Sequence, residues 1–443
     1  MAPLPSRHGR PTGRTPAERN RPRGQFRRWP TFARAADRAV LYIHAMLLPE
    51  PLQLLAGSRV RWRGRTLLYF AGCDYFRLSR HPRVVAALTA GARRFGLNVA
   101  ASRMTTGEHA LYGQLETALA EFFGAPAALL APGGYATSAF VAQALAGEFN
   151  RALLDERAHP ALRDAARHLA APVQTFPHRD AAAVQRLVRR APRARWLLLT
   201  DGLFAHDGSV APLDAYRRVL PPTATLLVDD AHGAGVLGAH GRGTPEHCGV
   251  GRARLIQCVT LSKAFGAYGG AVLGARALRE QILARSRAFT GCTPLPLPLA
   301  NAALAAVKLH QRGGAKLRAR LRANADWVKA RLRAAGWALP DHPGPVIPLH
   351  PLNAAAAQAI ERRLLAAGIH PPRLRYGAVR DWFRFVISSE HSPAQLAALV
   401  AALAPLTAAG KFSADTGTAR TRGTAARRRA QPPGPRSRRQ CAH

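Results

Sequence analysis

Lys263 is the residue whose type most clearly suggests chemistry. The chain has 64 Lys and Arg residues, but only five are lysines, and Lys263 is the only lysine among the first 307 residues. An amine must lose its proton before it attacks a carbonyl, which lysine can do and arginine cannot. Lys263 lies in Thr260-Leu-Ser-Lys263-Ala-Phe-Gly266, directly after a predicted strand. A Schiff-base role therefore accounts for this lysine, and the alternative is a surface lysine present by chance.

A second pattern is Leu226-Leu-Val-Asp229-Asp-Ala-His232, in which an apolar run ends at an aspartate and a histidine follows. Open α/β sheets bind ligands at the carboxyl ends of their strands. An aspartate there can pair with a cationic ring nitrogen, and a histidine can donate to a phenolic oxygen. Those groups make pyridoxal phosphate (PLP) an electron sink. The alternatives are a metal site or a structural aspartate that caps a helix.

Two further segments place polar or flexible residues after strand-like runs. In Ala131-Pro-Gly-Gly134-Tyr135, the glycines would let backbone N–H groups approach a phosphate at a helix N-terminus, with Tyr135 near a ring. In Leu153-Leu-Asp155-Glu-Arg-Ala-His159, the imidazole could stack on a flat aromatic cofactor. Taken alone, the first segment is equally a tight turn and the second an ordinary loop histidine.

Short apolar runs between longer helical stretches must position these residues. Such runs are typical of buried parallel strands, and their alternation with helices predicts a wound α/β sheet. The predicted strands of this sheet are Ala127–Ala131, Arg195–Thr200, Thr225–Asp229, Ile256–Leu261 and Gly270–Leu273. After Pro294 we expect helices at Leu299–Gln311 and Lys316–Ala335. Strands near Val346–Leu349 and Trp382–Ser388 follow, with a last helix at Pro393–Leu403.

These patterns divide the chain into five segments. Both ends are rich in Pro, Gly and Arg without periodicity and are expected to be disordered basic tails. The segments are a tail at 1–30, an N-terminal segment at 31–75, a large α/β domain at 76–300, a C-terminal α+β domain at 301–406 and a tail at 411–443.

Charge and cysteine content limit the class of protein. The formal net charge is +39, which attracts anionic partners, yet no aromatic-interleaved basic motif or zinc pattern accompanies it. We therefore expect no specific nucleic-acid partner and no metal. The five cysteines are scattered without a CxxC pair, which favours reduced thiols and a cytoplasmic protein. No apolar run reaches the length of about 20 residues that a membrane span needs.

Taken in order, these motifs resemble the α-oxoamine synthases, which are PLP enzymes of fold type I, the aspartate-aminotransferase fold. The resemblance covers residues of about 65 to 405. Further strings that carry it are Phe70-Ala-Gly-Cys-Asp74-Tyr75, Ala101-Ser102-Arg103-Met-Thr-Thr-Gly107 and Thr200-Asp-Gly202-Leu-Phe204. It implies an α/β fold with a large, mostly parallel-sheet domain, a smaller C-terminal α+β domain, and a homodimer.

The resemblance also implies a role for each matching residue. Lys263 corresponds to the Schiff-base lysine, Asp229 to the partner of the pyridine nitrogen, His232 to the partner of the phenolic oxygen and His159 to the stacking histidine. Gly134, Tyr135 and Thr260 match the phosphate site, to which Thr293 would contribute from the neighbouring subunit. Arg375 stands where the family places an arginine for the amino-acid carboxylate, and Arg384 matches a basic residue of its C-terminal strand.

The implied reaction is an acyl transfer. An amino acid, with L-alanine preferred over glycine or serine, condenses with an acyl thioester of CoA or acyl-carrier protein. Thiol and carbon dioxide leave, and a 2-amino ketone results. Three positions depart from the family pattern: Cys73 stands where the family usually has Asn, Tyr112 where it has His, and Ala205 where it has Ser. The competing hypothesis is a catalytically decayed PLP fold that binds partners through its basic tails.

Overall fold

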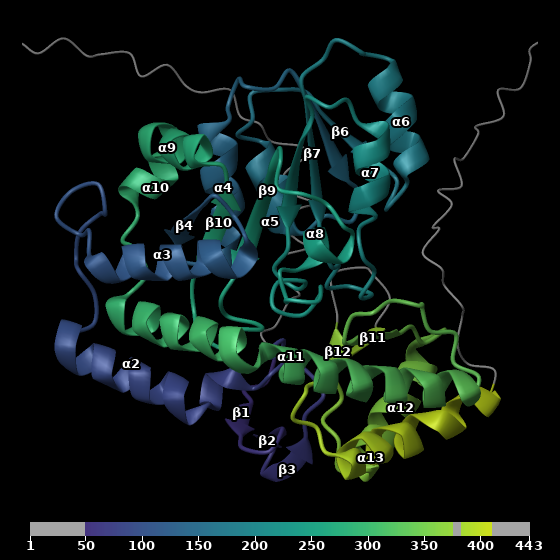
Figure 1. Cartoon of the computed structure of the whole chain (residues 1–443). Helices are drawn as coiled ribbons and strands as arrows, with labels where there is room; N and C mark the ends of the chain where they lie inside the picture. Colours follow the sequence, from purple (N-terminus) through teal and green to yellow (C-terminus); the bar gives the residue numbers. More distant parts are fainter. Residues whose placement is uncertain (1–48, 375–381, 410–443) are drawn as a thin grey trace, which may run out of the picture. The chain divides into compact units, whose positions relative to one another are not determined.

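A seven-stranded sheet forms the centre of the computed structural model, which describes residues 49–374 and 382–409 (Figure 1). The strand order across the sheet is β4-β10-β9-β8-β7-β5-β6. In chain order its strands are β4 (Ala127–Ala131), β5 (Arg151–Asp155), β6 (Val173–Phe176), β7 (Trp196–Asp201), β8 (Thr225–Asp229), β9 (Leu255–Thr260) and β10 (Gly270–Gly274). The five strands expected for this sheet are confirmed to within one residue at each end.

The sheet is mostly parallel, with one exception. Strands β6, β5, β7, β8 and β9 pair in parallel, whereas β10 is antiparallel to both β9 and β4. The expectation that Gly270–Leu273 is a parallel strand is therefore wrong. Only residues 261–269 connect β9 to β10. A parallel pair needs a crossover connection of roughly a dozen residues or more, so this short loop returns the chain antiparallel.

Both faces of the sheet are buried, which explains why its strands read as continuous apolar runs. In β4, Ala128 and Leu130 join the core under α3 (Ala110–Phe123) and α11 (Leu297–Ala334), while Leu129 and Ala131 join the core under α4 (Gly134–Ala144). This alternation is the period of two that a strand imposes on its side chains. The helices of this region are η1 (Leu78–Arg80), α2 (Pro82–Phe95), α3 (Ala110–Phe123), α4 (Gly134–Ala144), α5 (Pro160–Ala166), α6 (Ala181–Arg189), α7 (Leu213–Val219), α8 (Thr244–His247), α9 (Arg276–Arg285) and α10 (Arg287–Gly291).

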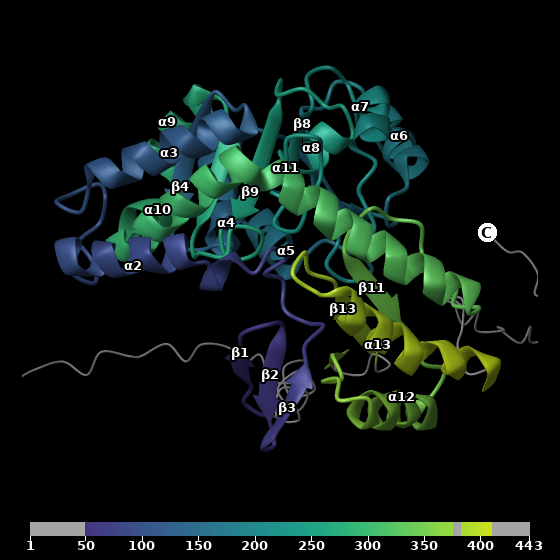
Figure 2. The ribbon, with the colours of Figure 1, turned by 60° about the horizontal axis from the view of Figure 1, so that its bottom comes forward.

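Helix α11 (Leu297–Ala334) is continuous, although two helices were expected here. That expectation ended the first helix before Gly313-Gly314, but glycine inside a helix costs only about 1 kcal/mol and tertiary packing compensates for it. The helix contacts α2 and α3 and also α13 (Figure 2). The domain boundary expected at residue 300 falls inside α11, and the division into two domains stays a prediction.

Two small antiparallel sheets complete the described residues. The first contains β1 (Gln53–Leu55), β2 (Arg59–Trp62) and β3 (Arg65–Leu68), within the expected N-terminal segment. The second has the order β11-β13-β12 and packs with C-terminal helices. Its elements are β11 (Val346–Leu349), α12 (Ala354–Ala366), β12 (Arg373–Leu374), β13 (Trp382–Val386), α13 (Pro393–Leu403) and η2 (Ala404–Ala409). The strand at Val346–Leu349 and the helix at Pro393–Leu403 are confirmed, and β13 ends two residues before the expected end.

Both expected tails, 1–30 and 411–443, lie outside the described residues. Within the part of the chain that the structure describes, no helix combines the length and the apolar character that crossing a membrane requires.

Asp230 anchors the loop that follows β8. Its carboxylate is fully buried and accepts hydrogen bonds from the Thr244 backbone N–H at 2.9 Å, the Thr244 hydroxyl at 2.6 Å and the Gln257 side-chain amide at 2.7 Å. In Asp230→Asn an NH₂ group replaces one of the two acceptor oxygens, so a donor of the new asparagine would face donors of Thr244 or Gln257 and a hydrogen bond would be lost. We expect the free energy of unfolding to fall by about 1–3 kcal/mol, measured by urea denaturation. An unchanged midpoint and slope would show that the network is dispensable.

Candidate active site

A cavity of about 260 Å³ lies at the carboxyl ends of β7, β8 and β9 and brings most of the predicted site residues together. Seven predicted residues line it: Gly134, Tyr135, His159, Asp229, His232, Thr260 and Lys263. They come from four separate stretches of sequence, so the wound sheet assembles the site. Across the described ranges, no group of three or more His, Cys, Asp or Glu side chains is arranged to hold a metal ion.

One end of the cavity is suited to an anion. Gly133 precedes α4 and supplies no side-chain cap, and the first residues of this helix, Gly134 and Tyr135, line the cavity. A Cβ atom on Gly134 would lie 2.8 Å from the Thr260 Cβ, so only glycine allows this close approach. The Thr260 and Ser262 hydroxyl oxygens are 2.8 Å apart beside it. Backbone donors, two hydroxyls and the helix dipole together fit a phosphate group.

Another part of the cavity wall carries two buried carboxyl groups. Asp229 ends β8, and Asp201 ends the neighbouring strand β7 directly opposite it. Burial raises the pKa of Asp201 well above its usual value, and the nearby Asp229 raises it further. Burial also raises the pKa of Asp229, while Lys263 lowers it. Two adjacent buried acids favour a cationic partner, and a protonated ring nitrogen is such a partner.

Asp201 lines the cavity but was not among the predicted site residues, although it belongs to the motif Thr200-Asp-Gly202. The signal was present, because an acidic residue ends the apolar run just before Gly202, as Asp229 ends its own run. Its position opposite Asp229 follows only from the strand pairing.

Lys263 and His232 form a hydrogen-bonded pair inside the cavity. The Lys263 Nζ is 2.8 Å from the His232 Nε2, and the His232 Nδ1 is 2.6 Å from the Tyr75 hydroxyl oxygen. Burial lowers the pKa of Lys263, although nearby acidic groups oppose this shift. Burial also places the pKa of His232 well below its usual value. Both shifts favour neutral nitrogen atoms, and a neutral amine is what attack on a carbonyl requires.

His159 is fixed at the cavity wall by the start of α5. Its Nδ1 accepts a hydrogen bond from the Ala161 backbone N–H at 3.2 Å, and its own backbone N–H donates to Asp201 at 3.0 Å. Burial lowers the pKa of its imidazole. Its ring centroid lies 6.1 Å from that of Tyr135, whose hydroxyl donates to Asp164. Two aromatic rings that line the cavity are therefore held in place by hydrogen bonds to neighbouring residues, and the stacking role of His159 stays a prediction.

Among the described residues, the predicted site residues Arg384 and Thr293 do not line this cavity. Arg384 in β13 donates to the Ala205 carbonyl at 3.3 Å, and its charge lowers the pKa of both His232 and Lys263, which places it near them. Thr293 is exposed. Arg375 lies outside the described residues.

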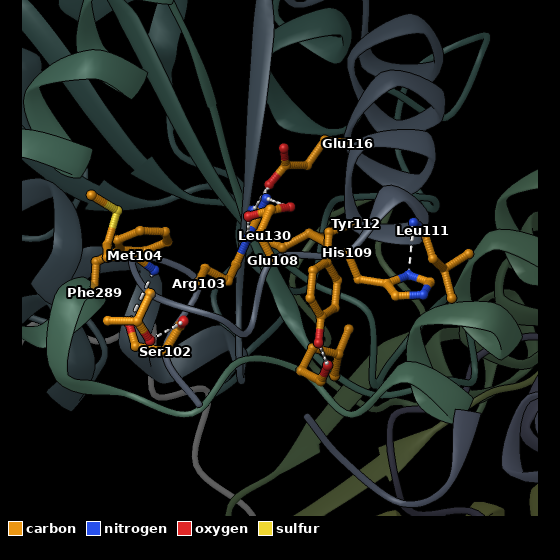
Figure 3. Close-up of polar contacts among 12 residues, drawn as sticks. Ser102, Arg103, Met104, Glu108, His109, Leu111, Tyr112, Glu116, Leu130 and Phe289 are labelled. Atoms are coloured by element: carbon orange, nitrogen blue, oxygen red, sulfur yellow. Dashed lines mark hydrogen bonds and ion pairs between the residues drawn. The ribbon is translucent and has the colours of Figure 1, made fainter. Parts of the chain in front are cut away.

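Tyr112, one of the three departures, has a structural role. Its hydroxyl donates to the Leu295 carbonyl at 2.7 Å, and the Ser102 hydroxyl donates to the Thr290 carbonyl at 2.6 Å (Figure 3). The buried Arg103 pairs with Glu116 and Glu108 next to Tyr112. These contacts hold the stretch of chain that contains Thr293.

The geometry fits PLP at three points: the uncapped helix N-terminus suits its phosphate, the buried acids suit its ring nitrogen, and a lysine amine with a lowered pKa suits its aldehyde. The family model described as "Aminotransferase class I and II" matches residues 69–403 of this chain. The chain therefore belongs to the aminotransferase class I and II family, and within it to the PLP-dependent α-oxoamine synthases.

Among its relatives is the 8-amino-7-oxononanoate synthase of Methylococcus capsulatus, 37% identical over 354 residues that cover 78% of this chain and 91% of the relative. That of Trichlorobacter lovleyi is 35% identical over 348 residues, covering 77% and 88%. Among solved structures, the serine palmitoyltransferase of Sphingomonas wittichii superposes with a TM-score of 0.77 at 25% identity, covering 84% of this chain and 96% of that one. The predicted family, fold class and cofactor are confirmed.

Proposed function

We propose that this chain catalyses the 8-amino-7-oxononanoate synthase reaction, in which L-alanine condenses with an acyl thioester and loses carbon dioxide. The observation that carries the proposal is the convergence of Lys263, Asp229 and His232 in one cavity beside an anion site. Curated relatives that bear this name cover most of the chain. The glycine-rich and C-terminal segments of the sequence favour the same member of the family. This reaction belongs to biotin biosynthesis, and scattered reduced cysteines suit a cytoplasmic enzyme.

Each cavity residue has a definite task in this proposal. PLP, when bound, accepts electron density from the α-carbon of the amino acid. The Lys263 amine would hold the cofactor aldehyde, and as a free base it would take the α-proton of the amino acid. Asp229 keeps a proton on the ring nitrogen, and His232 donates to the phenolic oxygen. The uncapped start of α4 and the Thr260 hydroxyl bind the phosphate.

Two arginines, Arg384 and Arg375, are proposed to bind the substrate carboxylates. The assignment of Arg384 is supported by its charge, which lowers the pKa of both His232 and Lys263. We assign Arg375 the amino-acid carboxylate on the family resemblance. The thioester carrier is CoA or acyl-carrier protein, and glycine or serine are the alternative amino acids.

The test is a spectral titration followed by a substrate panel. Purified protein with PLP should absorb in the visible range of a PLP imine, and L-alanine should perturb that band more strongly than glycine or serine does. Product formation is then assayed by mass spectrometry with CoA and carrier-protein thioesters of a dicarboxylic acyl group. Perturbation by serine alone, with product from a long-chain monocarboxylic thioester, would assign a different member of the family.

We propose further that the active unit is a homodimer. Thr293 is exposed and does not line its own cavity, and the chain on either side of it is held at Thr290 by Ser102 and at Leu295 by Tyr112. Thr293 is therefore available to a neighbouring chain. We expect sedimentation velocity of the PLP-saturated protein to give the mass of a dimer. Thr293→Ala should lower the affinity for PLP while it leaves the sedimentation coefficient unchanged. A PLP-saturated monomer with full turnover would contradict the shared site.

A further inference from the structure

Tyr75 is a buried tyrosine that contacts the cavity residue His232 but does not itself line the cavity. Its side chain is 0% exposed, and its hydroxyl oxygen is 2.6 Å from the His232 Nδ1. Its backbone is fixed on two sides, because its N–H donates to the Cys73 carbonyl and its carbonyl accepts from the Ser389 N–H, each at 2.9 Å. The phenol therefore approaches the imidazole from a fixed direction.

A continuous hydrogen-bonded chain runs from this phenol to the lysine amine. The His232 Nε2, on the other side of the ring, is 2.8 Å from the Lys263 Nζ. A neutral imidazole carries one N–H and one lone pair, so the two hydrogen bonds must run in the same direction along the chain. The protonation of the amine and the tautomer of the histidine are thus coupled.

Two directions are possible for this chain. In the first, the phenol donates to Nδ1, so Nε2 carries the proton and donates to the lone pair of a neutral amine. In the second, the amine, protonated or neutral, donates to Nε2, Nδ1 donates to the phenol oxygen, and the phenol proton needs another acceptor, so only the first direction requires a neutral amine. Two other polar side chains act on the phenol, the thiol of Cys73 and the guanidinium of Arg384, and of these only the thiol can accept a hydrogen bond. A thiol is a weaker acceptor than an imidazole nitrogen, and a buried phenol O–H without a good acceptor is costly.

We propose that Tyr75 is a positioning residue that fixes His232 as the Nε2–H tautomer and thereby holds the Lys263 amine neutral. This inference rests on the proposed function only for the reason that a neutral amine is needed, which is attack on the cofactor carbonyl. Burial raises the pKa of Tyr75 well above its usual value, so the phenol keeps the proton that it donates. Burial keeps the pKa of His232 well below its usual value, so the ring stays neutral.

Other charges also act on this chain, and the test must leave them in place. The groups that face Lys263 or His232 are Cys73, His159, Asp201, Asp229 and Arg384. The Tyr75→Phe substitution removes one oxygen atom and alters none of these groups. A change in the pKa of Lys263 in this variant therefore reports the loss of the phenol.

The experiment measures how fast acetic anhydride acetylates Lys263 as a function of pH, in the full-length chain before PLP is added. Mass spectrometry follows the peptide that contains Lys263, which is well separated in sequence from the other four lysines. Without the phenol, Nε2 no longer has to carry the proton, and the amine is protonated more easily. We expect the midpoint for Lys263 in Tyr75→Phe to rise by about half to one pH unit. An unchanged or lower midpoint would overturn the proposal.

Tyr216→Phe is the matched control. Tyr216 is also fully buried, but its hydroxyl has no hydrogen-bond partner among the described residues. Its removal should leave the midpoint of Lys263 unchanged, and an equal rise in both variants would count against the role of Tyr75. Circular dichroism establishes that both variants are folded.

Direct observation of the tautomer needs no variant of Tyr75. Imidazole ¹⁵N NMR of the wild-type chain, with the His232 signals identified by their loss in His232→Asn, should show the proton on Nε2. A proton on Nδ1 would overturn the proposal. These measurements use no PLP, so they stand apart from the absorbance titration, whose failure would instead count against the proposed function.

Discussion

Replacing Lys263 with arginine should abolish turnover. Guanidinium stays protonated, so it can neither attack the cofactor carbonyl nor remove an α-proton. Loss of an ordinary general base costs about 10²–10⁴-fold in rate, and Lys263 combines that role with covalent attachment of the cofactor. We therefore expect a loss greater than about 10⁴-fold for Lys263→Arg and Lys263→Ala. The measurement is product formation by mass spectrometry, together with the absorbance of the PLP imine.

The matched control for this prediction is Lys308→Arg. Lys308 is an exposed lysine of α11, outside the cavity, and its replacement should leave turnover at the wild-type level. If the Lys263→Arg protein kept measurable synthase activity, the assignment of Lys263 would fail. Unchanged absorbance in Lys263→Ala would have the same consequence.

Residues at strand ends were the part of the site that sequence could predict. Asp229 and Lys263 each follow a continuous apolar run, and such runs are the local signature of strands buried on both faces. Since carboxyl ends of parallel strands meet at one edge, the two residues were expected to share a site, and they do. Gly134 was predictable because a glycine that follows a strand lets backbone N–H groups approach an anion.

Contacts between distant segments could not be predicted in this way. Tyr75 and His232 are 157 residues apart, and no periodicity links them. Asp201 becomes a neighbour of Asp229 only when the order of the strands is known. Likewise, Gly313-Gly314 looks like a break, and only the packing of α11 against other helices shows why the helix continues.

Asp229 and Asp230 are adjacent in the sequence but have different roles, and their asparagine variants should show opposite defects. Asp229 lines the cavity, and its carboxylate accepts a hydrogen bond from the Ala231 backbone N–H at 3.2 Å. Asp229→Asn should therefore keep its stability and still bind PLP. It should lose activity by about 10²-fold or more, because a neutral amide cannot hold the proton on the ring nitrogen.

The comparison needs both variants in the same two assays, urea denaturation and steady-state turnover. Asp230 is satisfied by Thr244 and Gln257 and does not line the cavity, so Asp230→Asn should lose stability while the folded fraction keeps most of its activity. Wild-type turnover in Asp229→Asn would make that residue structural. If Asp230→Asn lost activity at full stability, the second aspartate would carry the chemistry instead. The two variants thus decide which of the two adjacent carboxylates serves the cofactor, and they test the assignment of that role to Asp229.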